Sequence, residues 1–114
     1  MDIKIKSKFW LEDEKGRPIF GGGRRAILEK IDELGSIKAA AENLGISYRA
    51  VWGKIKTMEE RLGARLVETF PGGGREKGAR LTPTAGELIK MFKELDEVGT
   101  AQADALFKRI FQGK

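Results

Sequence analysis

Residues 35–63 read GSIKAAAENLGISYRAVWGKIKTMEERLG, and this stretch decides the fold that the sequence predicts. Ser36 is a good N-cap for a short helix over residues 37–44, and Gly45 ends that helix as a left-handed cap would. A second helix, over residues 48–62, begins after only three further residues. Two helices around so short a turn have the spacing of a helix-turn-helix.

The helix predicted over residues 48–62 has two distinct faces. Apolar residues recur at i, i+4, i+7 and i+11 and must point to the core: Val51, Ile55, Met58 and Leu62. The opposite face carries Arg49, Gly53 and Lys56, flanked by Trp52 and Thr57. Arginine is the commonest reader of guanine edges, and an aromatic ring can contact a thymine methyl group. We therefore predict a recognition helix with Tyr48 and Arg49 in its first turn, against the alternative of a solvated face with Trp52 packed on a neighbour.

The rest of the chain predicts a mostly α, α+β winged helix-turn-helix domain. Residues 3–11 alternate between apolar and polar side chains, and residues 17–20 return, which predicts an N-terminal β-hairpin. Residues 24–34 have the spacing of an amphipathic helix that ends at a glycine. Residues 65–70 and 79–81 predict a second β-hairpin, in the position of a wing.

Basic residues gather in the loop of the predicted wing. Three of them accompany a single acidic residue there: Arg75, Lys77 and Arg80. In a winged domain this loop would lie along the phosphate backbone and supply salt-sensitive, sequence-independent affinity. The alternative is a solvated hairpin tip. Ser36, with a helix N-terminus behind it, is a further candidate for a phosphate contact through backbone N–H groups, although any capped helix has the same arrangement.

A long helix follows the wing. Thr82 caps it and Pro83 occupies its first position, where the missing N–H is harmless. Nothing but two glycines opposes helix from residue 84 to about residue 112, a length of roughly 40 Å at about 1.5 Å per residue. Its apolar stripe needs a partner, for which a second copy of the chain is the simplest candidate. We expect the dimer interface to include Leu88, Phe92, Leu95, Leu106 and Ile110.

These elements predict two parts. The first is a winged helix-turn-helix domain over residues 1–82, with the helix-turn-helix at about 36–62 and the wing at about 65–82. The second is a dimerisation helix over residues 83–114.

The composition fits one small domain with a polyanionic partner. The chain has 114 residues, and 22 Lys and Arg against 17 Asp and Glu give a net charge of +5. This excess of positive charge suggests nucleic acid first and a membrane surface second. No run approaches the ~20 apolar residues that a membrane helix needs, so we expect a cytoplasmic protein without a membrane partner.

The sequence contains few of the residues on which enzyme active sites usually depend. The sequence has no Cys and no His, which excludes disulfides, zinc fingers, thiol nucleophiles and the usual neutral-pH proton shuttle. Neighbouring carboxylates such as Asp13 with Glu14, or Glu59 with Glu60, diverge on a helix or strand and are interpreted as solvated charges. We expect neither enzyme activity nor a bound metal.

A glycine-rich stretch invites a nucleotide-binding interpretation. Residues 21–26 read GGGRRA and fit the outline G-x-G-x-x-A between a short strand and a helix. A dinucleotide site needs a parallel strand after that helix, whereas Gly35 and Ser36 lead directly into another helix. Nucleotide binding is therefore not expected.

Residues 24–89 resemble the N-terminal winged helix-turn-helix domain of the molybdate-responsive ModE regulators and, more distantly, the LysR-type regulators. The most specific features are GISY at residues 45–48 with Trp52 four residues on, the basic glycine-rich wing, and the Leu-Thr and Ala-Gly pairs that open the next helix. The resemblance implies a homodimer with recognition helices in successive major grooves, about 34 Å apart on a palindromic site. It also implies DNA contacts from Ser47, Tyr48, Arg49, Trp52, Gly53 and Lys56, and from Arg75, Lys77 and Arg80 in the wing.

The resemblance also bears on cofactors. ModE proteins that sense molybdate carry a C-terminal oxyanion-binding region after this domain, whereas the present sequence ends at Lys114. We therefore expect no cofactor, and no binding of molybdate or tungstate.

The sequence thus predicts a regulator that binds specific double-stranded DNA as a homodimer. Two alternatives stay open at this point. An architectural DNA-binding protein would use the same basic faces with weak sequence preference. A protein-interaction module would use the wing and Trp52 to bind an acidic partner.

Overall fold

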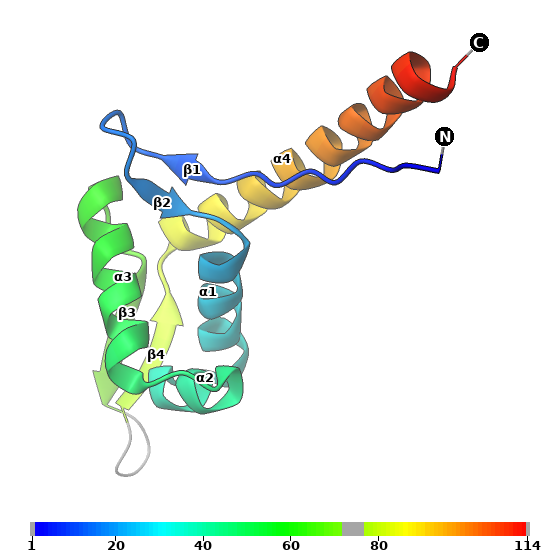
Figure 1. The fold of residues 1–114 in the computed structure, drawn as a ribbon. Coiled ribbons are helices and arrows are strands. Elements are labelled where there is room, and N and C mark those ends of the chain that lie inside the picture. The colour runs from blue at the N-terminus through cyan, green and yellow to red at the C-terminus, as the bar shows by residue number, and fades with distance from the viewer. Residues whose placement is uncertain (1, 72–76, 114) are drawn as a thin grey trace.

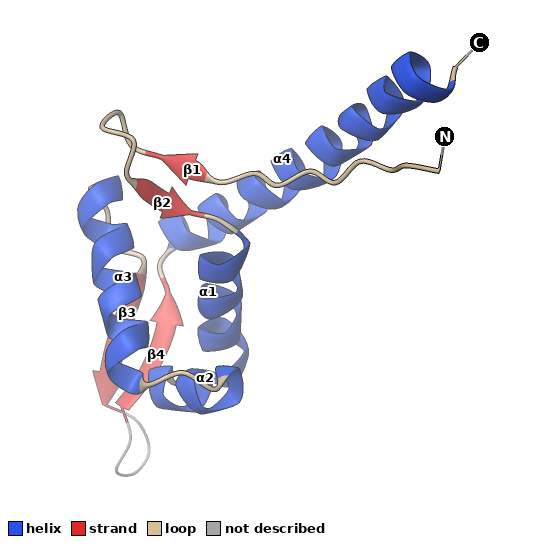
Figure 2. Cartoon of the chain, viewed as in Figure 1, coloured by secondary structure: helices blue, strands red, loops and turns tan. Residues whose placement is uncertain are grey.

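The computed structural model describes residues 2–71 and 77–113 and contains helices, two short hairpins and a long C-terminal helix (Figure 1). The elements in chain order are β1 (Leu11–Glu12), β2 (Pro18–Phe20), α1 (Gly22–Leu34), α2 (Ile37–Leu44), α3 (Tyr48–Leu62), β3 (Val67–Pro71), β4 (Lys77–Leu81) and α4 (Pro83–Phe107). A π-helical turn, η1 (Lys108–Gln112), continues α4. Helices α1, α2 and α3 and the β3–β4 hairpin form one body, from which α4 projects (Figure 2).

The helix ends follow the capping residues that the sequence predicted. The hydroxyl oxygens of Ser36 and Ser47 accept the backbone N–H groups of Ala39 and Ala50, at 3.1 and 3.0 Å. Gly45 closes α2 in the left-handed region, with φ of 69°, a conformation that costs a residue with a Cβ energy. The predicted helix-turn-helix is therefore confirmed, with its turn held by local hydrogen bonds.

The core is shared by every layer of the body. Its largest fully buried side chains come from β2, α1, α3 and the start of the wing: Phe20, Leu28, Ile31, Val51, Ile55, Met58 and Leu66. The rings of Phe20 and Phe92 meet edge to face, with centroids 5.2 Å apart, so α4 packs on the N-terminal hairpin. The predicted core face of α3 is confirmed.

The wing is an antiparallel hairpin anchored to the helices. Strands β3 and β4 pair from Val67↔Leu81 to Pro71↔Lys77. The backbone N–H of Ala79 donates to the carbonyl of Gly35 at 2.9 Å, which ties β4 to the corner between α1 and α2. The predicted wing is confirmed: β3 begins two residues later and ends one residue later than the sequence indicated, and β4 begins two residues earlier.

The predicted N-terminal strand over residues 3–11 was wrong in extent. Only Leu11 and Glu12 pair with β2, and the residues before them are extended without regular secondary structure. Strand β2 has only three residues, so few residues of the N-terminal segment can pair with it by backbone hydrogen bonds. Phe9 instead packs against α4, where a Cβ on Gly99 would lie 2.8 Å from its ring, while Ile3 and Ile5 remain exposed.

The long C-terminal helix is confirmed, but two residues assigned to its dimer interface belong to the core. Leu88 and Phe92 are buried in the chain itself, because the first turns of α4 lie on the body. The predicted boundary after residue 82 therefore cuts through a continuous core. Leu95, Leu106 and Ile110, the other three predicted interface residues, are exposed.

Candidate nucleic-acid interface

Helix α3 presents its polar face to the outside of the body. Arg49, Gly53 and Lys56 are exposed, whereas Val51 and Ile55 on the opposite face are fully buried. Ser47 at the N-cap is exposed as well, so the first turn and the polar face form one continuous surface. The structure thus brings together the recognition-helix residues that the sequence singled out.

Two aromatic residues lie together at one edge of this surface. The rings of Tyr48 and Trp52 meet edge to face with centroids 6.4 Å apart, and Tyr48 is 51% exposed. Trp52 is half-buried and packs against the core, and the Lys56 ammonium lies over its ring at 5.2 Å from the centroid. Trp52 therefore combines a packing role with an exposed edge beside a positive charge.

The hydroxyl of Thr57 is used inside the helix. Its Oγ1 donates to the backbone carbonyl of Gly53 at 2.9 Å. A Cβ placed on Gly53 would meet no atom within 4 Å among the residues that the structure describes. Packing within that part of the chain therefore does not require glycine at this position.

Glu59 joins α3 to the wing, which corrects its interpretation as a solvated charge. The side chain is buried, and Oε2 accepts the backbone N–H groups of Leu66 and Val67 at 2.8 and 3.2 Å. Lys56 and Arg65 each lie 3.7 Å from its carboxylate oxygens. The available signal was position, since Glu59 follows the core residue Ile55 by four and so lies beside the buried face.

Of the three basic residues predicted in the wing, the structure describes the side chain of Arg80. The Arg80 guanidinium lies over the Phe70 ring, 5.1 Å from the centroid, and its Nε is 3.2 Å from a carboxylate oxygen of Glu68. Arg75 lies outside the described residues, and Lys77 is described only by its backbone as the first residue of β4. Arg80 is exposed on the hairpin that follows α3.

Ser36 lies inward of this surface. It is 9% exposed, and its hydroxyl oxygen is occupied as the cap of α2. The predicted phosphate contact near Ser36 would therefore be made by backbone N–H groups in the first turn of α2, not by the Ser36 hydroxyl.

The described part of the chain contains neither a candidate metal site nor a candidate membrane-spanning helix. Residues 2–71 and 77–113 hold no cluster of three or more side chains suited to a metal ion. None of the helices described combines the length and the apolar character needed to cross a membrane.

Comparison with known proteins places this geometry in a family. The model described as "Bacterial regulatory helix-turn-helix protein, lysR family" matches residues 24–86. This chain belongs to that family. The matched LysR-family segment runs from α1 through the wing to the first turn of α4, and so contains the whole polar face of α3.

Individual relatives of this LysR-family chain include molybdenum-related proteins. It is 38% identical over 89 residues to the molybdenum-pterin-binding protein MopB of Rhodobacter capsulatus, covering 78% of this chain and 33% of MopB. It is 39% identical over 70 residues to the molybdenum transport protein ModE of Herbaspirillum seropedicae, covering 61% and 26% of the two chains. The ModE-type resemblance seen in the sequence is thereby confirmed, and the chain spans about a third or less of these relatives.

Solved structures of the LysR family share the fold. ArgP from Mycobacterium tuberculosis is 34% identical with a TM-score of 0.51, over 77% of this chain and 31% of ArgP. The BenM DBD in its complex with catB site 1 DNA is 25% identical with a TM-score of 0.52, over 81% and 96% of the two chains.

Proposed function

We propose that this chain binds specific sequences of double-stranded DNA and acts as a transcriptional regulator of the ModE-like type. The observation that carries the proposal is the exposed polar face of α3, with Arg49, Gly53 and Lys56 opposite a fully buried apolar face. A helix of this kind, second in a helix-turn-helix, fits the major groove and reads bases from its first turns. The LysR-family membership supports the same conclusion.

The residues on this face have distinct proposed roles. Arg49 offers the paired donors that match the guanine edge, and Tyr48 and Trp52 offer apolar contacts. Glycine inside a helix costs about 0.5–1 kcal/mol relative to alanine. Because a Cβ at Gly53 would meet no atom of the described chain within 4 Å, we assign that cost to close approach of the helix backbone to the groove wall.

The wing supplies sequence-independent affinity in this proposal. Arg80 is exposed, and Arg75 and Lys77 come from the same hairpin and its loop. Contacts from such residues to phosphates position a protein on DNA and depend steeply on salt. Backbone N–H groups at the start of α2, beside Ser36, are a further proposed phosphate contact.

A homodimer completes the proposed regulator. Large apolar side chains remain exposed along α4 and η1: Met91, Leu95, Val98, Leu106, Ile110 and Phe111. A stripe of this kind on a projecting helix buries itself against a second copy. Such a protein needs neither a cofactor nor catalytic residues, and it acts on DNA in the cytoplasm.

The test is selection of duplexes from a random pool by the purified chain, at near-physiological salt with competitor DNA. The expected result is an inverted repeat whose half-sites are one helical turn apart. Binding without enrichment of any sequence would overturn the proposal in favour of an architectural DNA-binding protein. Failure to bind any duplex would overturn it in favour of a protein-interaction module.

A further inference from the structure

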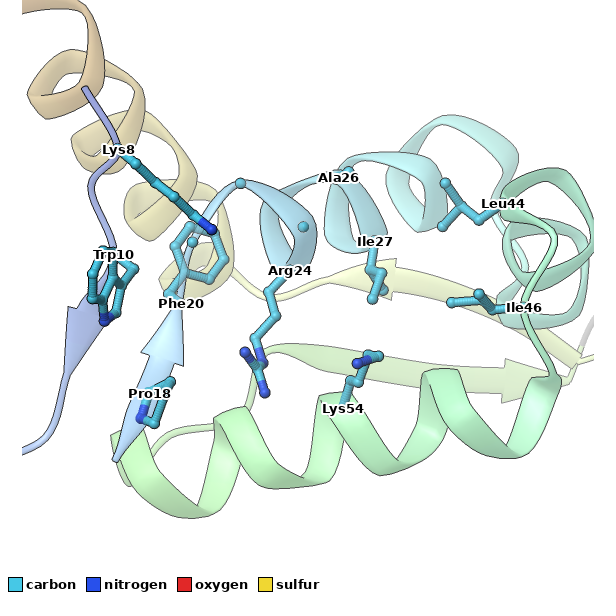
Figure 3. A pocket seen from close by; sticks show the side chains of 13 residues that line it. Lys8, Trp10, Pro18, Phe20, Arg24, Ala26, Ile27, Leu44, Ile46 and Lys54 are labelled. Carbon is cyan, nitrogen blue, oxygen red and sulfur yellow. The ribbon is translucent and has the colours of Figure 1, made fainter. Parts of the chain in front are cut away.

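A cleft of about 620 Å³ opens between the N-terminal segment, α1 and one flank of α3 (Figure 3). Its walls include the side chains of Trp10, Phe20 and Ile27, and three cations reach it from different elements: Lys8, Arg24 and Lys54. Figure 3 shows Arg24 extending from α1 toward α3, which carries Lys54. No aspartate or glutamate is among the described residues that line the cleft, so its charge is entirely positive.

Arg24 lacks the partner that a partly buried guanidinium ordinarily has. Its Nε is buried, and within the described chain it has no hydrogen-bond partner. A hydrogen bond to a charged group stabilises more than one between neutral groups, and a buried charged donor left without a partner is correspondingly costly. The Nε of Arg25 is likewise buried without a hydrogen bond in the described chain, but it lies 3.4 Å from a carboxylate oxygen of Glu29 in an ion pair. The Arg24 side chain thus extends along a cleft whose described lining residues include no carboxylate that could pair with it.

The N-terminus of α1 adds further positive potential at the same place. Its N-cap, Gly21, makes no side-chain capping bond, and the first turn carries no acidic residue. Gly21, Gly22 and Gly23 all line the cleft, so the first backbone N–H groups of α1 border it without side chains in the way. Free N–H groups at a helix N-terminus favour an anion.

The apolar walls limit what kind of anion fits. An inorganic anion would use the cations and leave the Trp10 and Ile27 surfaces wet, whereas an apolar body would cover them. Lys54 follows Gly53 directly and so lies about 100° around α3 from it. The cleft therefore flanks the proposed DNA-reading face and is concave, which suits a small molecule better than a duplex.

We propose that this cleft binds a small organic anion with an apolar body. The anionic group lies between Arg24, Lys54 and the N-terminus of α1, and the body lies against Trp10 and Ile27. This site goes beyond the proposed DNA-binding function and does not depend on it.

Calorimetric titration of the full chain with naphthalene-2-carboxylate tests the proposal. We expect saturable binding of one carboxylate per chain, with naphthalene-2-carboxamide and inorganic phosphate each at least tenfold weaker. Fluorescence of Trp10 in a Trp52→Phe variant should change along the same binding curve, because Trp10 lines the cleft. Absence of saturable binding up to millimolar carboxylate, or equal binding of the amide, would overturn the proposal.

Single variants locate the site. Arg24→Ala and Lys54→Ala should each weaken carboxylate binding at least tenfold, whereas Arg25→Ala, outside the cleft, should leave it unchanged. Lys54 is exposed, so its variant keeps the test valid even if Arg24→Ala fails to fold. Unchanged carboxylate binding in Lys54→Ala would contradict the assignment. A loss of DNA affinity in these variants without any carboxylate binding would assign the cations to DNA phosphates instead.

Discussion

The Glu59 carboxylate accepts a hydrogen bond from the backbone N–H of Leu66 at 2.8 Å, and this contact links the end of α3 to the start of the wing. The same oxygen accepts from Val67 at 3.2 Å. One buried side chain therefore joins the two elements proposed to contact DNA, α3 and the wing, in addition to the core that they share.

Removal of this link should destabilise the fold. Glu59→Ala leaves two buried backbone N–H groups without a partner, and we expect a loss of about 1–3 kcal/mol in the free energy of unfolding. Urea denaturation followed by circular dichroism measures it. The neighbouring Glu60 is exposed, so Glu60→Ala should stay within about 0.5 kcal/mol of wild type. Equal losses in the two variants would contradict the role given to Glu59.

Replacement of Arg49 should remove sequence discrimination. Arg49→Ala should weaken binding to the preferred duplex by about 1–3 kcal/mol and relax the preference at one base position, because a bidentate guanine contact is lost. Fluorescence anisotropy with preferred and scrambled duplexes measures both effects. Lys93→Ala, on the exposed side of α4, is the control and should leave the ratio of affinities unchanged. A uniform loss on both duplexes in Arg49→Ala would identify a phosphate contact instead.

The wing should contribute affinity without discrimination. Arg80→Ala is expected to weaken binding to all duplexes about equally and to reduce the slope of log K against log salt by about 1. Glu68→Gln makes the matched variant, because it releases Arg80 from an ion pair of 3.2 Å and should strengthen binding slightly. Loss of preference for one sequence in Arg80→Ala would show base contact rather than phosphate contact.

The exposed stripe at the end of α4 should control self-association. Substitution of both Leu106 and Ile110 by alanine should raise the dimer dissociation constant at least tenfold, because interface anchors typically cost more than ~1 kcal/mol each when truncated. Light scattering over a range of protein concentrations measures it. The control pair Lys93→Ala and Lys108→Ala keeps the helix and leaves the stripe intact. An unchanged dimer in the Leu106 and Ile110 variant would refute the stripe as the interface.

Asp13 should titrate at unusually low pH. The backbone N–H of Arg17 donates to its Oδ1 at 2.9 Å, and this bond, assisted by the Arg17 guanidinium and the N–H of Lys15, holds the pKa of Asp13 below its ordinary 3.8. A lowered folded-state pKa stabilises the turn above pH ~4, and the contribution is lost as the pH falls through the lowered pKa.

Carboxyl NMR shifts measured against pH give this value directly. In Arg17→Ala the backbone donor remains, so the pKa of Asp13 should rise only part of the way to 3.8. A wild-type pKa at or above 3.8 would contradict the hydrogen-bonded turn.

Local chemistry explains what the sequence could predict. Ser36, Gly45 and Ser47 determine helix ends through hydrogen bonds to residues three or four positions away. The helix-turn-helix can therefore be predicted from the sequence without knowledge of tertiary contacts. The faces of α3 follow from helical periodicity alone, which is why Arg49 and Lys56 were placed correctly on its outer face.

The sequence-based predictions that the structure corrects all depend on contacts between segments that are far apart in the chain. The alternation of residues 3–11 suits a strand, but α4 rather than a strand lies beside Phe9. The apolar stripe of α4 packs on the core in its first turns and is exposed further along. Periodicity alone does not show where this change occurs, because Phe92 is buried by its contact with Phe20, which lies far away in the sequence. Glu59 was missed because its backbone partners belong to a later element.

The affinity ratio between the selected duplex and a scrambled duplex of equal length, at near-physiological salt, tests the central claim most directly. A specific regulator that reads bases through α3 should favour its selected duplex by ~10³-fold or more. A ratio near one, together with a steep salt dependence, would contradict sequence-specific recognition and leave only phosphate binding.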